Sequence, residues 1–82
     1  MMNSKKYLND AELSARDDVA RQIRELKKNS GLTIPQLAAI ADLTPGHLCE
    51  IYREDGDKIP SFRSMIRILD ALGLKEVTIR WK

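Results

Sequence analysis

The stretch that decides the fold is residues 33–53, TIPQLAAIADLTPGHLCEIYR. Thr33 can N-cap a helix, and Gln36, three residues later, can accept a hydrogen bond from the Thr33 amide, which completes a capping box. Pro35 falls in the first turn of this helix, where a missing amide hydrogen costs little. These residues predict a helix that begins directly after Thr33.

The same stretch predicts a second helix that crosses the first one closely. The small Ala38 lets two helices approach each other, where a larger residue would hold them apart. Asp42 lies at a turn that usually requires a left-handed backbone, which Gly adopts freely and Asp tolerates at modest cost. Thr44 can cap the second helix, and Pro45 suits its first position. Two short helices joined by such a turn form a helix-turn-helix motif.

The residues before the motif predict a polar arm and a supporting helix. Residues 1–13 are polar and mixed in charge, and we expect a flexible N-terminal arm there. Ser14 and Asp17 give a capping signal, so we expect the helix to begin at this point. Gly31 can end it as a C-cap. Its apolar stripe repeats at helical spacing: Val19, Ile23 and Leu26.

The residues after the motif predict a loop and one more helix. The loop EDGDKIP, residues 54–60, is acidic but lacks the alternating ligands and the closing Glu of a calcium-binding loop, so we interpret it as solvated. Ser61 can cap the next helix and Gly73 can stop it. The apolar face of this helix is predicted from Phe62, Met65, Ile66, Leu69 and Leu72. We interpret the stripe Met65, Ile68, Leu69 and Leu72 as core, with a ligand pocket as the alternative.

The last residues, 75–82, change period. Val77, Ile79 and Trp81 alternate with polar residues, which is typical of a β-strand. A single strand has unpaired edges, so it needs a partner strand. We expect the same strand of a second copy, related by a two-fold axis, with these three side chains in the dimer interface. For Trp81 the alternative is contact with a partner protein.

Composition limits the class of protein. The chain has 82 residues, of which 43% are hydrophobic and 32% are charged, and it carries a net charge of +2. No apolar run is long enough to cross a membrane, and the N-terminus lacks the apolar core of a signal peptide. The single Cys49 suits a reducing compartment, so we expect a cytoplasmic, one-domain protein. Basic residues gather in 19–32 and 62–82, whereas 33–61 is acidic, so a polyanion would meet the flanking segments first.

No pattern indicates an enzyme. His47 and Cys49 are two residues apart, but no second pair completes a tetrahedral metal site. On one helix their side chains point in nearly opposite directions, so they do not form a nucleophile and base either. We therefore expect no catalytic residue, no metal and no cofactor.

From Val19 to Leu74 the sequence resembles the XRE family, the helix-turn-helix proteins of the Cro and phage-repressor type. The segments that carry the resemblance are IRELKKNSGLT (23–33), IPSF (59–62) and MIRILDALGL (65–74), with the spaced Ala38, Leu43, Leu48 and Ile51. The tail LKEVTIRWK (74–82) is similar to that of HipB-type antitoxins, which dimerise through a shared β-ribbon.

The resemblance implies an all-α, lambda-repressor-like bundle of four to five helices in residues 14–74, followed by a dimerisation strand in 75–82. It implies a homodimeric repressor that binds a palindromic operator in double-stranded DNA. If the tail resemblance extends to function, the protein is the antitoxin of a toxin–antitoxin pair and autoregulates its operon. The residues it assigns to DNA contact are Gln36, Thr44, Pro45, Gly46, His47, Glu50, Arg53, Lys58, Ser61 and Arg63.

These positions also depart from the family pattern. Pro45 and Gly46 offer no side-chain hydrogen bond, and Glu50 can accept from cytosine N4 but repels phosphate. We expect Thr44, His47 and Arg53 to make most polar contacts. Lys58 and Arg63, with helix amides near Ile34 and Ser61, would hold phosphates. The alternative is a protein-interaction module that keeps the fold and neutralises or scaffolds a partner without recognising DNA.

Overall fold

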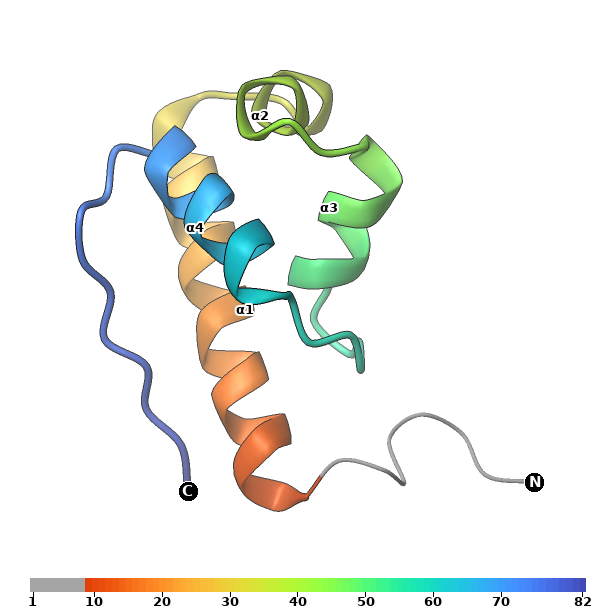
Figure 1. Ribbon diagram of the computed structural model, residues 1–82, viewed down its shortest axis with the longest axis vertical. Helices are drawn as coiled ribbons and strands as arrows, with labels where there is room; N and C mark the ends of the chain where they lie inside the picture. Colours follow the sequence, from red (N-terminus) through yellow and green to blue (C-terminus); the bar gives the residue numbers. More distant parts are fainter. Residues whose placement is uncertain (1–8) are drawn as a thin grey trace.

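The computed structural model describes residues 9–82, which contain four helices (Figure 1). They are α1 (Asp10–Ser30), α2 (Ile34–Ala41), α3 (Pro45–Tyr52) and α4 (Phe62–Ala71), and an extended tail, residues 75–82, follows α4. Helix α1 is the long support, and the three short helices pack beside it. No helix within residues 9–82 is both long and apolar enough to span a membrane.

Helix α1 begins earlier than predicted. Asn9 is its N-cap, and a capping box joins Asn9 and Glu12, because the side chain of each accepts a hydrogen bond from the backbone N–H of the other. The predicted start at Ser14 is therefore wrong, and residues 10–13 of the expected arm are helical. Residues 1–8 lie outside the described part of the chain. Gly31 ends α1 in the left-handed conformation, as predicted.

The helix-turn-helix prediction is confirmed in detail. Thr33 caps α2, and Gln36 completes the capping box. Asp42 follows α2 with φ 59° and ψ 47°, in the left-handed region, and its N–H donates to Ala38 O and Ala39 O. Thr44 then caps α3, whose first residue is Pro45. The turn between α2 and α3 therefore consists of the residue types that its backbone requires.

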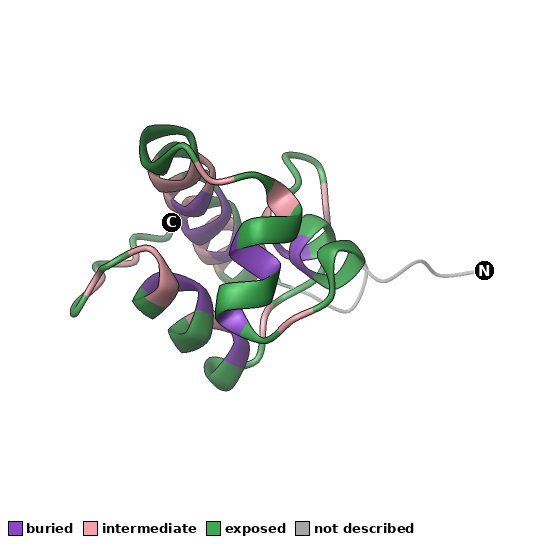
Figure 2. Ribbon diagram, turned by 90° about the horizontal axis from the view of Figure 1, so that it is seen from above, coloured by how far each residue is buried: buried purple, intermediate pink, exposed green. Residues whose placement is uncertain are grey.

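The core lies where α1, α2, α3 and α4 meet. Figure 2 shows the buried residues of each helix on the sides that face the neighbouring helices. Ala38 is 1% exposed, in agreement with its predicted place at a close helix approach. The buried apolar residues are Val19, Ala20, Ile23, Leu37, Ala38, Ala41, Leu48, Ile51, Ile68 and Leu69.

Helix α4 packs on the core with most, but not all, of the apolar residues predicted for its buried face. Phe62 and Ile66 were expected in its apolar face, yet they are 75% and 44% exposed. The predicted core stripe is confirmed, because Ile68 and Leu69 are buried and Met65 and Leu72 pack on the core. Ser64 is buried as well, which the sequence did not predict. Helix α4 packs against α2, and this contact selects the side that carries Ser64 and Ile68. Residues four apart share a helix face, so the side with Phe62 and Ile66 faces outward.

The predicted C-terminal strand is not formed in the single chain, because residues 9–82 contain no β-strand. The tail lies alongside α1 in the opposite direction (Figure 1). Its backbone bonds to α1 side chains: Gln22 Nε2 donates to Thr78 O (2.7 Å), Arg80 N to Asp18 Oδ2 (3.0 Å) and Lys82 N to Ser14 Oγ (3.1 Å).

A match of repeat lengths explains how the tail fits α1. Two extended residues advance about 6.6 Å. Four helical residues advance about 6 Å. Alternate tail residues therefore meet α1 side chains spaced four apart, without a second strand. The alternation of Val77 and Ile79 is nevertheless real, because both side chains are half-buried on the core.

Candidate nucleic-acid interface

All ten residues assigned to DNA contact are exposed. They come from the first turn of α2, from both ends of α3, from the loop before α4 and from the first turn of α4. Figure 2 shows these short helices with exposed residues on their outer sides. The structure thus places the predicted residues on accessible surface.

The first turns of α3 and α4 are neighbours. Thr44 Oγ1 accepts from His47 N at 3.2 Å and so closes the start of α3. The His47 ring extends across to α4, where its Nε2 is 3.5 Å from Ser64 Oγ. Ser61 caps α4, with its Oγ accepting from Ser64 N at 3.1 Å. The His47–Ser64 contact therefore brings two helix N-termini to one place.

This junction suits a bound anion. A helix N-terminus has amide groups without intrahelical acceptors and the positive end of the helix dipole. At α4 the Ser61 side chain satisfies Ser64 N. The amides of Phe62 and Arg63 belong to the same turn and can donate outward. The exposed Arg63 side chain forms no ion pair within residues 9–82 and adds a positive charge.

The N-terminus of α2 has fewer groups available to bind an anion than the N-terminus of α4. Gln36 Oε1 accepts from Thr33 N at 2.9 Å, so the oxygen of this side chain is used by the capping box. The predicted contact through Gln36 would use its side-chain nitrogen. Pro35 also removes one of the amides that a helix N-terminus normally presents. We therefore assign α2 a smaller part in anion contact than α4.

Three cations near this surface are paired with carboxylates. The exposed pairs are Lys58–Glu50 (4.0 Å), Arg53–Asp55 (3.5 Å) and Arg67–Asp42 (3.7 Å). Exposed ion pairs contribute little to stability. A phosphate can therefore replace the carboxylate at small cost, and these cations remain available to a polyanion.

The outward side of α3 holds few groups that recognise a base. Pro45 and Gly46 have no hydrogen-bonding side chain, and Cys49 is exposed. Thr44, His47 and Glu50 remain, all exposed. A hydroxyl contacts several bases, whereas a carboxylate accepts from cytosine N4. The chemistry of α3 favours a small number of base contacts supported by many backbone contacts.

Sequence reasoning missed two arginines of α1 that hold the end of α3. Arg16 is 2% exposed, and its Nη2 donates to Glu50 O (3.2 Å) and Ile51 O (3.1 Å). Arg24 Nη1 donates to Tyr52 O at 2.5 Å. One signal was present in the sequence. Arg16 continues the stripe of Val19 and Ile23 toward the N-terminus at i, i+3, i+7, so a charged residue occupies a buried face.

Comparison with known proteins places this fold. No protein-family model matches the chain, and no curated protein matches it significantly. Among solved structures, one match is the crystal structure of the clp gene regulator ClgR from C. glutamicum. The TM-score is 0.65 at 27% identity, over 72% of this chain and 73% of that chain. The protein shares a helix-turn-helix fold with ClgR. The XRE and HipB-type resemblances remain predictions from the sequence.

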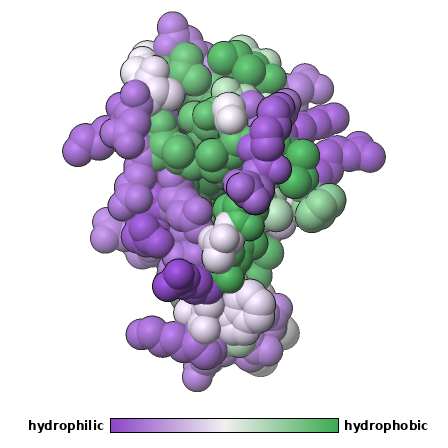
Figure 3. Space-filling model, turned by 90° about the vertical axis from the view of Figure 1, so that its left-hand side faces the viewer, coloured by the Kyte–Doolittle hydropathy of each residue, from purple (hydrophilic) through white to green (hydrophobic). Residues whose placement is uncertain are grey.

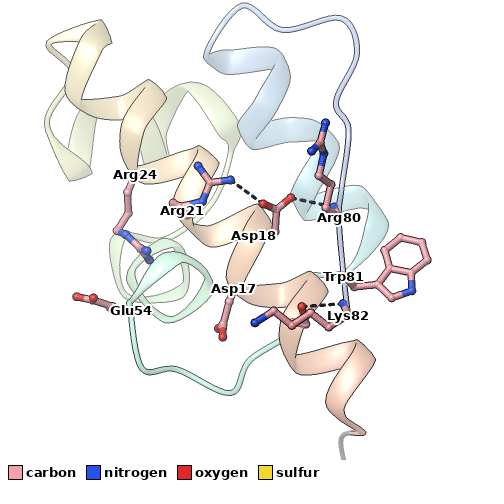
Figure 4. A pocket seen from close by; sticks show the side chains of 9 residues that line it. Asp17, Asp18, Arg21, Arg24, Glu54, Arg80, Trp81 and Lys82 are labelled. Atoms are coloured by element: carbon pink, nitrogen blue, oxygen red, sulfur yellow. Dashed lines mark hydrogen bonds and ion pairs between the residues drawn. The ribbon is translucent and has the colours of Figure 1, made fainter.

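The three residues assigned to a dimer interface lie in the tail. Val77 and Ile79 pack on the protein's own core, whereas Trp81 is 63% exposed. Figure 4 shows the tail against α1, where Asp18 accepts both from Arg80 N and from the Arg21 side chain. The Arg80 N–H bond, followed by the Arg21 contact, lowers the pKa of Asp18 below its ordinary value. The charged form of Asp18 thus favours the docked tail.

Proposed function

We propose that the protein is a sequence-specific, DNA-binding transcription regulator in which α3 enters the major groove. The observation that carries this proposal is the junction of the α3 and α4 N-termini, exposed on a helix-turn-helix fold like that of a gene regulator. In such motifs the second helix meets base edges with its N-terminal residues. Here those residues are Thr44 and His47.

Most of the affinity would come from backbone contacts. The amides at the start of α4 and the Arg63 side chain lie at the junction with the start of α3, whereas Arg53 and Lys58 follow the end of α3; all are exposed and would hold phosphates. Base contacts by Thr44, His47 and Glu50 would add the sequence preference. Bound over a promoter, the protein would act as a repressor because it blocks access to the DNA.

We further propose that it binds as a homodimer through the tail. Thr78 O and the amides of Arg80 and Lys82 face α1, so the N–H and C=O groups of Val77, Ile79 and Trp81 point to the opposite edge. Within residues 9–82 those groups have no hydrogen-bond partner. In Figure 1 the tail is the outermost segment on its side. Figure 3 shows an apolar area on this side of the molecule, bordered by polar side chains.

An open edge of this kind is a template for another extended chain. Antiparallel pairing with the tail of a second copy would form the two-fold ribbon and would place two copies of α3 on one side of the DNA. The decisive variant is Ile79→Pro, which removes one outward N–H. Ile79→Ala also removes the isoleucine side chain but keeps the backbone N–H. Sedimentation should give monomers for Ile79→Pro and dimers for Ile79→Ala, and two equal dimers would refute tail pairing.

The test of DNA binding is a gel shift with the DNA upstream of the protein's own gene, together with a duplex library of random sequence. Retardation and enrichment of one sequence are expected. Arg53→Ala with Arg63→Ala should reduce the slope of log affinity against log salt by about 2, since each phosphate contact contributes about 0.9. The matched control removes two charges from the last turn of α1 that form no ion pair within residues 9–82, Lys27→Ala with Lys28→Ala. No retardation of the wild type at low salt would refute the proposal.

The second candidate function is a protein-interaction module without DNA recognition. Pro45, Gly46 and Glu50 favour it, because α3 offers little base-recognising chemistry. In that case the slope for Arg53→Ala with Arg63→Ala would equal that of the control pair. The two functions therefore predict different outcomes in the same salt titration.

An antitoxin role is the finer form of the regulator proposal. It is supported by the similarity of residues 74–82 to the tails of HipB-type antitoxins and by the exposed Trp81, which could contact a toxin. The test is co-expression with the product of the adjacent reading frame. The role is supported if this protein restores growth that the product inhibits and the Trp81→Ala variant does not. The role is refuted if the product, expressed alone, causes no growth defect.

A further inference from the structure

We propose that Arg16 is a positioning residue for DNA recognition, because its buried guanidinium fixes both the end of α3 and the loop that leads to α4. This inference rests on the proposed function. Arg16 belongs to α1 and would not touch DNA. Its effect would pass through the two elements that do.

The contacts of Arg16 join three parts of the chain. Its side chain is 0% exposed. Nη2 donates to Glu50 O and Ile51 O, the last turn of α3, and Nε donates to Lys58 O at 3.2 Å, in the loop. Nη1 pairs with Asp17 Oδ1 at 3.3 Å, which supplies the only carboxylate in the set. Backbone carbonyls thus accept most of the hydrogen bonds of a buried charge.

Most carbonyls in the last turn of α3 accept hydrogen bonds from side chains of α1. The last four carbonyls of a helix have no intrahelical donor. In α3, Cys49 O accepts from Arg53 N, whereas Glu50 O and Ile51 O accept from Arg16 and Tyr52 O accepts from Arg24. In α2 and α4, by contrast, backbone N–H groups of the residues that follow each helix donate to carbonyls of its last turn. The end of α3 is therefore capped largely by side chains of α1.

Gly56 shows how closely the loop covers this guanidinium. A Cβ atom added at Gly56 would lie 2.5 Å from Arg16 Nη2 and 2.7 Å from Arg53 Cγ. The φ angle of Gly56 is not positive, so the glycine is needed for space and not for its backbone conformation. Arg53 is exposed and can move aside, but the Arg16 guanidinium is held by its acceptors. A side chain at residue 56 therefore requires either the guanidinium or the loop that covers it to shift.

The geometry gives Arg16 influence over recognition. Helix α3 has 8 residues, which is too short to be stable without its neighbours. The Lys58 carbonyl that Arg16 holds lies three residues before Ser61, the N-cap of α4. One guanidinium thus fixes the spacing between α3 and the phosphate-binding start of α4. Lysine cannot replace it, because an ammonium lacks the planar fork that reaches several carbonyls at once.

The test uses Arg16→Lys and Gly56→Ala, with Arg21→Lys as the matched control on the exposed side of α1. The probe is the duplex that the wild type selects from a random library, compared with a scrambled duplex. Both variants should lose about tenfold or more of the affinity ratio between the two duplexes, the scale of one mispositioned base contact. The salt slope on the scrambled duplex should stay unchanged, because every phosphate-contacting side chain remains, and the affinity for that duplex should fall less than the affinity for the selected duplex.

A second measurement separates positioning from loss of fold and does not need DNA. Amide hydrogen exchange of Tyr52 and Arg53 should accelerate in both variants and not in Arg21→Lys, while exchange of the buried Ile23 and Leu37 stays slow. If the wild type selects no duplex, the proposed function fails, and exchange alone decides whether Arg16 holds α3. If the wild type selects a duplex but both variants keep the affinity ratio, the positioning role is refuted and the function stands.

Discussion

The turn between α2 and α3 allows a sharp test, because Asp42 is the only non-glycine residue with positive φ within residues 9–82. We consider Asp42→Gly, Asp42→Asn and Asp42→Val. Glycine adopts φ 59° freely, Asn and Asp tolerate it, and a β-branched residue is strongly disfavoured there. The three variants therefore separate backbone strain from the charge of Asp42.

The expected magnitudes follow from opposing effects. Relief of the left-handed conformation by glycine is worth about 1 kcal/mol, and the greater backbone freedom of glycine in the unfolded chain costs about 0.5–1 kcal/mol. The Asp42–Arg67 pair is 3.7 Å long, and the Asp42 side chain is 88% exposed, so its loss costs only a few tenths of a kcal/mol. Asp42→Gly and Asp42→Asn should thus be nearly neutral. Asp42→Val should lose about 1–2 kcal/mol, since it takes the full steric penalty.

The assay is urea unfolding followed by circular dichroism, which gives the free energy of unfolding of each variant. In a domain of this size, about 1 kcal/mol corresponds to a shift of about 4–8 °C in melting temperature. Asp42→Asn serves as the control for charge. A wild-type free energy of unfolding for Asp42→Val would refute the steric argument. A loss above about 1.5 kcal/mol for Asp42→Gly would show that the Asp side chain does more than tolerate the turn.

Three further predictions concern the core, the tail and a tyrosine. Leu48 is 0% exposed, so Leu48→Ala should lower the free energy of unfolding by about 2–5 kcal/mol, measured in urea; a loss below about 1 kcal/mol would contradict its burial. The pKa of Asp18 is lowered in the folded protein, so ionised Asp18 stabilises the docked tail at pH values above its ordinary pKa of 3.8. This stabilisation is lost as the pH falls through the lowered pKa of the folded protein. Protection of the Arg80 amide should therefore fall in acid, whereas Asp18→Asn should have weaker protection that does not depend on pH in this range. Burial raises the pKa of Tyr52 above 10.0, so folding stability should fall as pH rises past 10.0, and Tyr52→Phe should remove that fall in pH-dependent melts.

Local signals accounted for much of this fold. The starts of α2, α3 and α4 follow from Thr33, Thr44 and Ser61, because an N-cap acts on a residue three positions later. The start of α1 could have been found in the same way, since Asn9 and Glu12 form a capping box. For the candidate site, sequence placed all ten residues on exposed positions but could not show that the α3 and α4 N-termini meet.

The sequence by itself determined where helices begin, where they end and which turn joins α2 to α3, because these features depend on neighbours three to five residues apart. Tertiary structure decided the rest. The contacts of Arg16 with Ile51, and of Asp18 with Arg80, join residues 35 and 62 positions apart. Such contacts form only when the helices have packed, and no local pattern fixes the partner. The outward side of α4, the docking of the tail and the support of α3 by α1 were therefore set by packing.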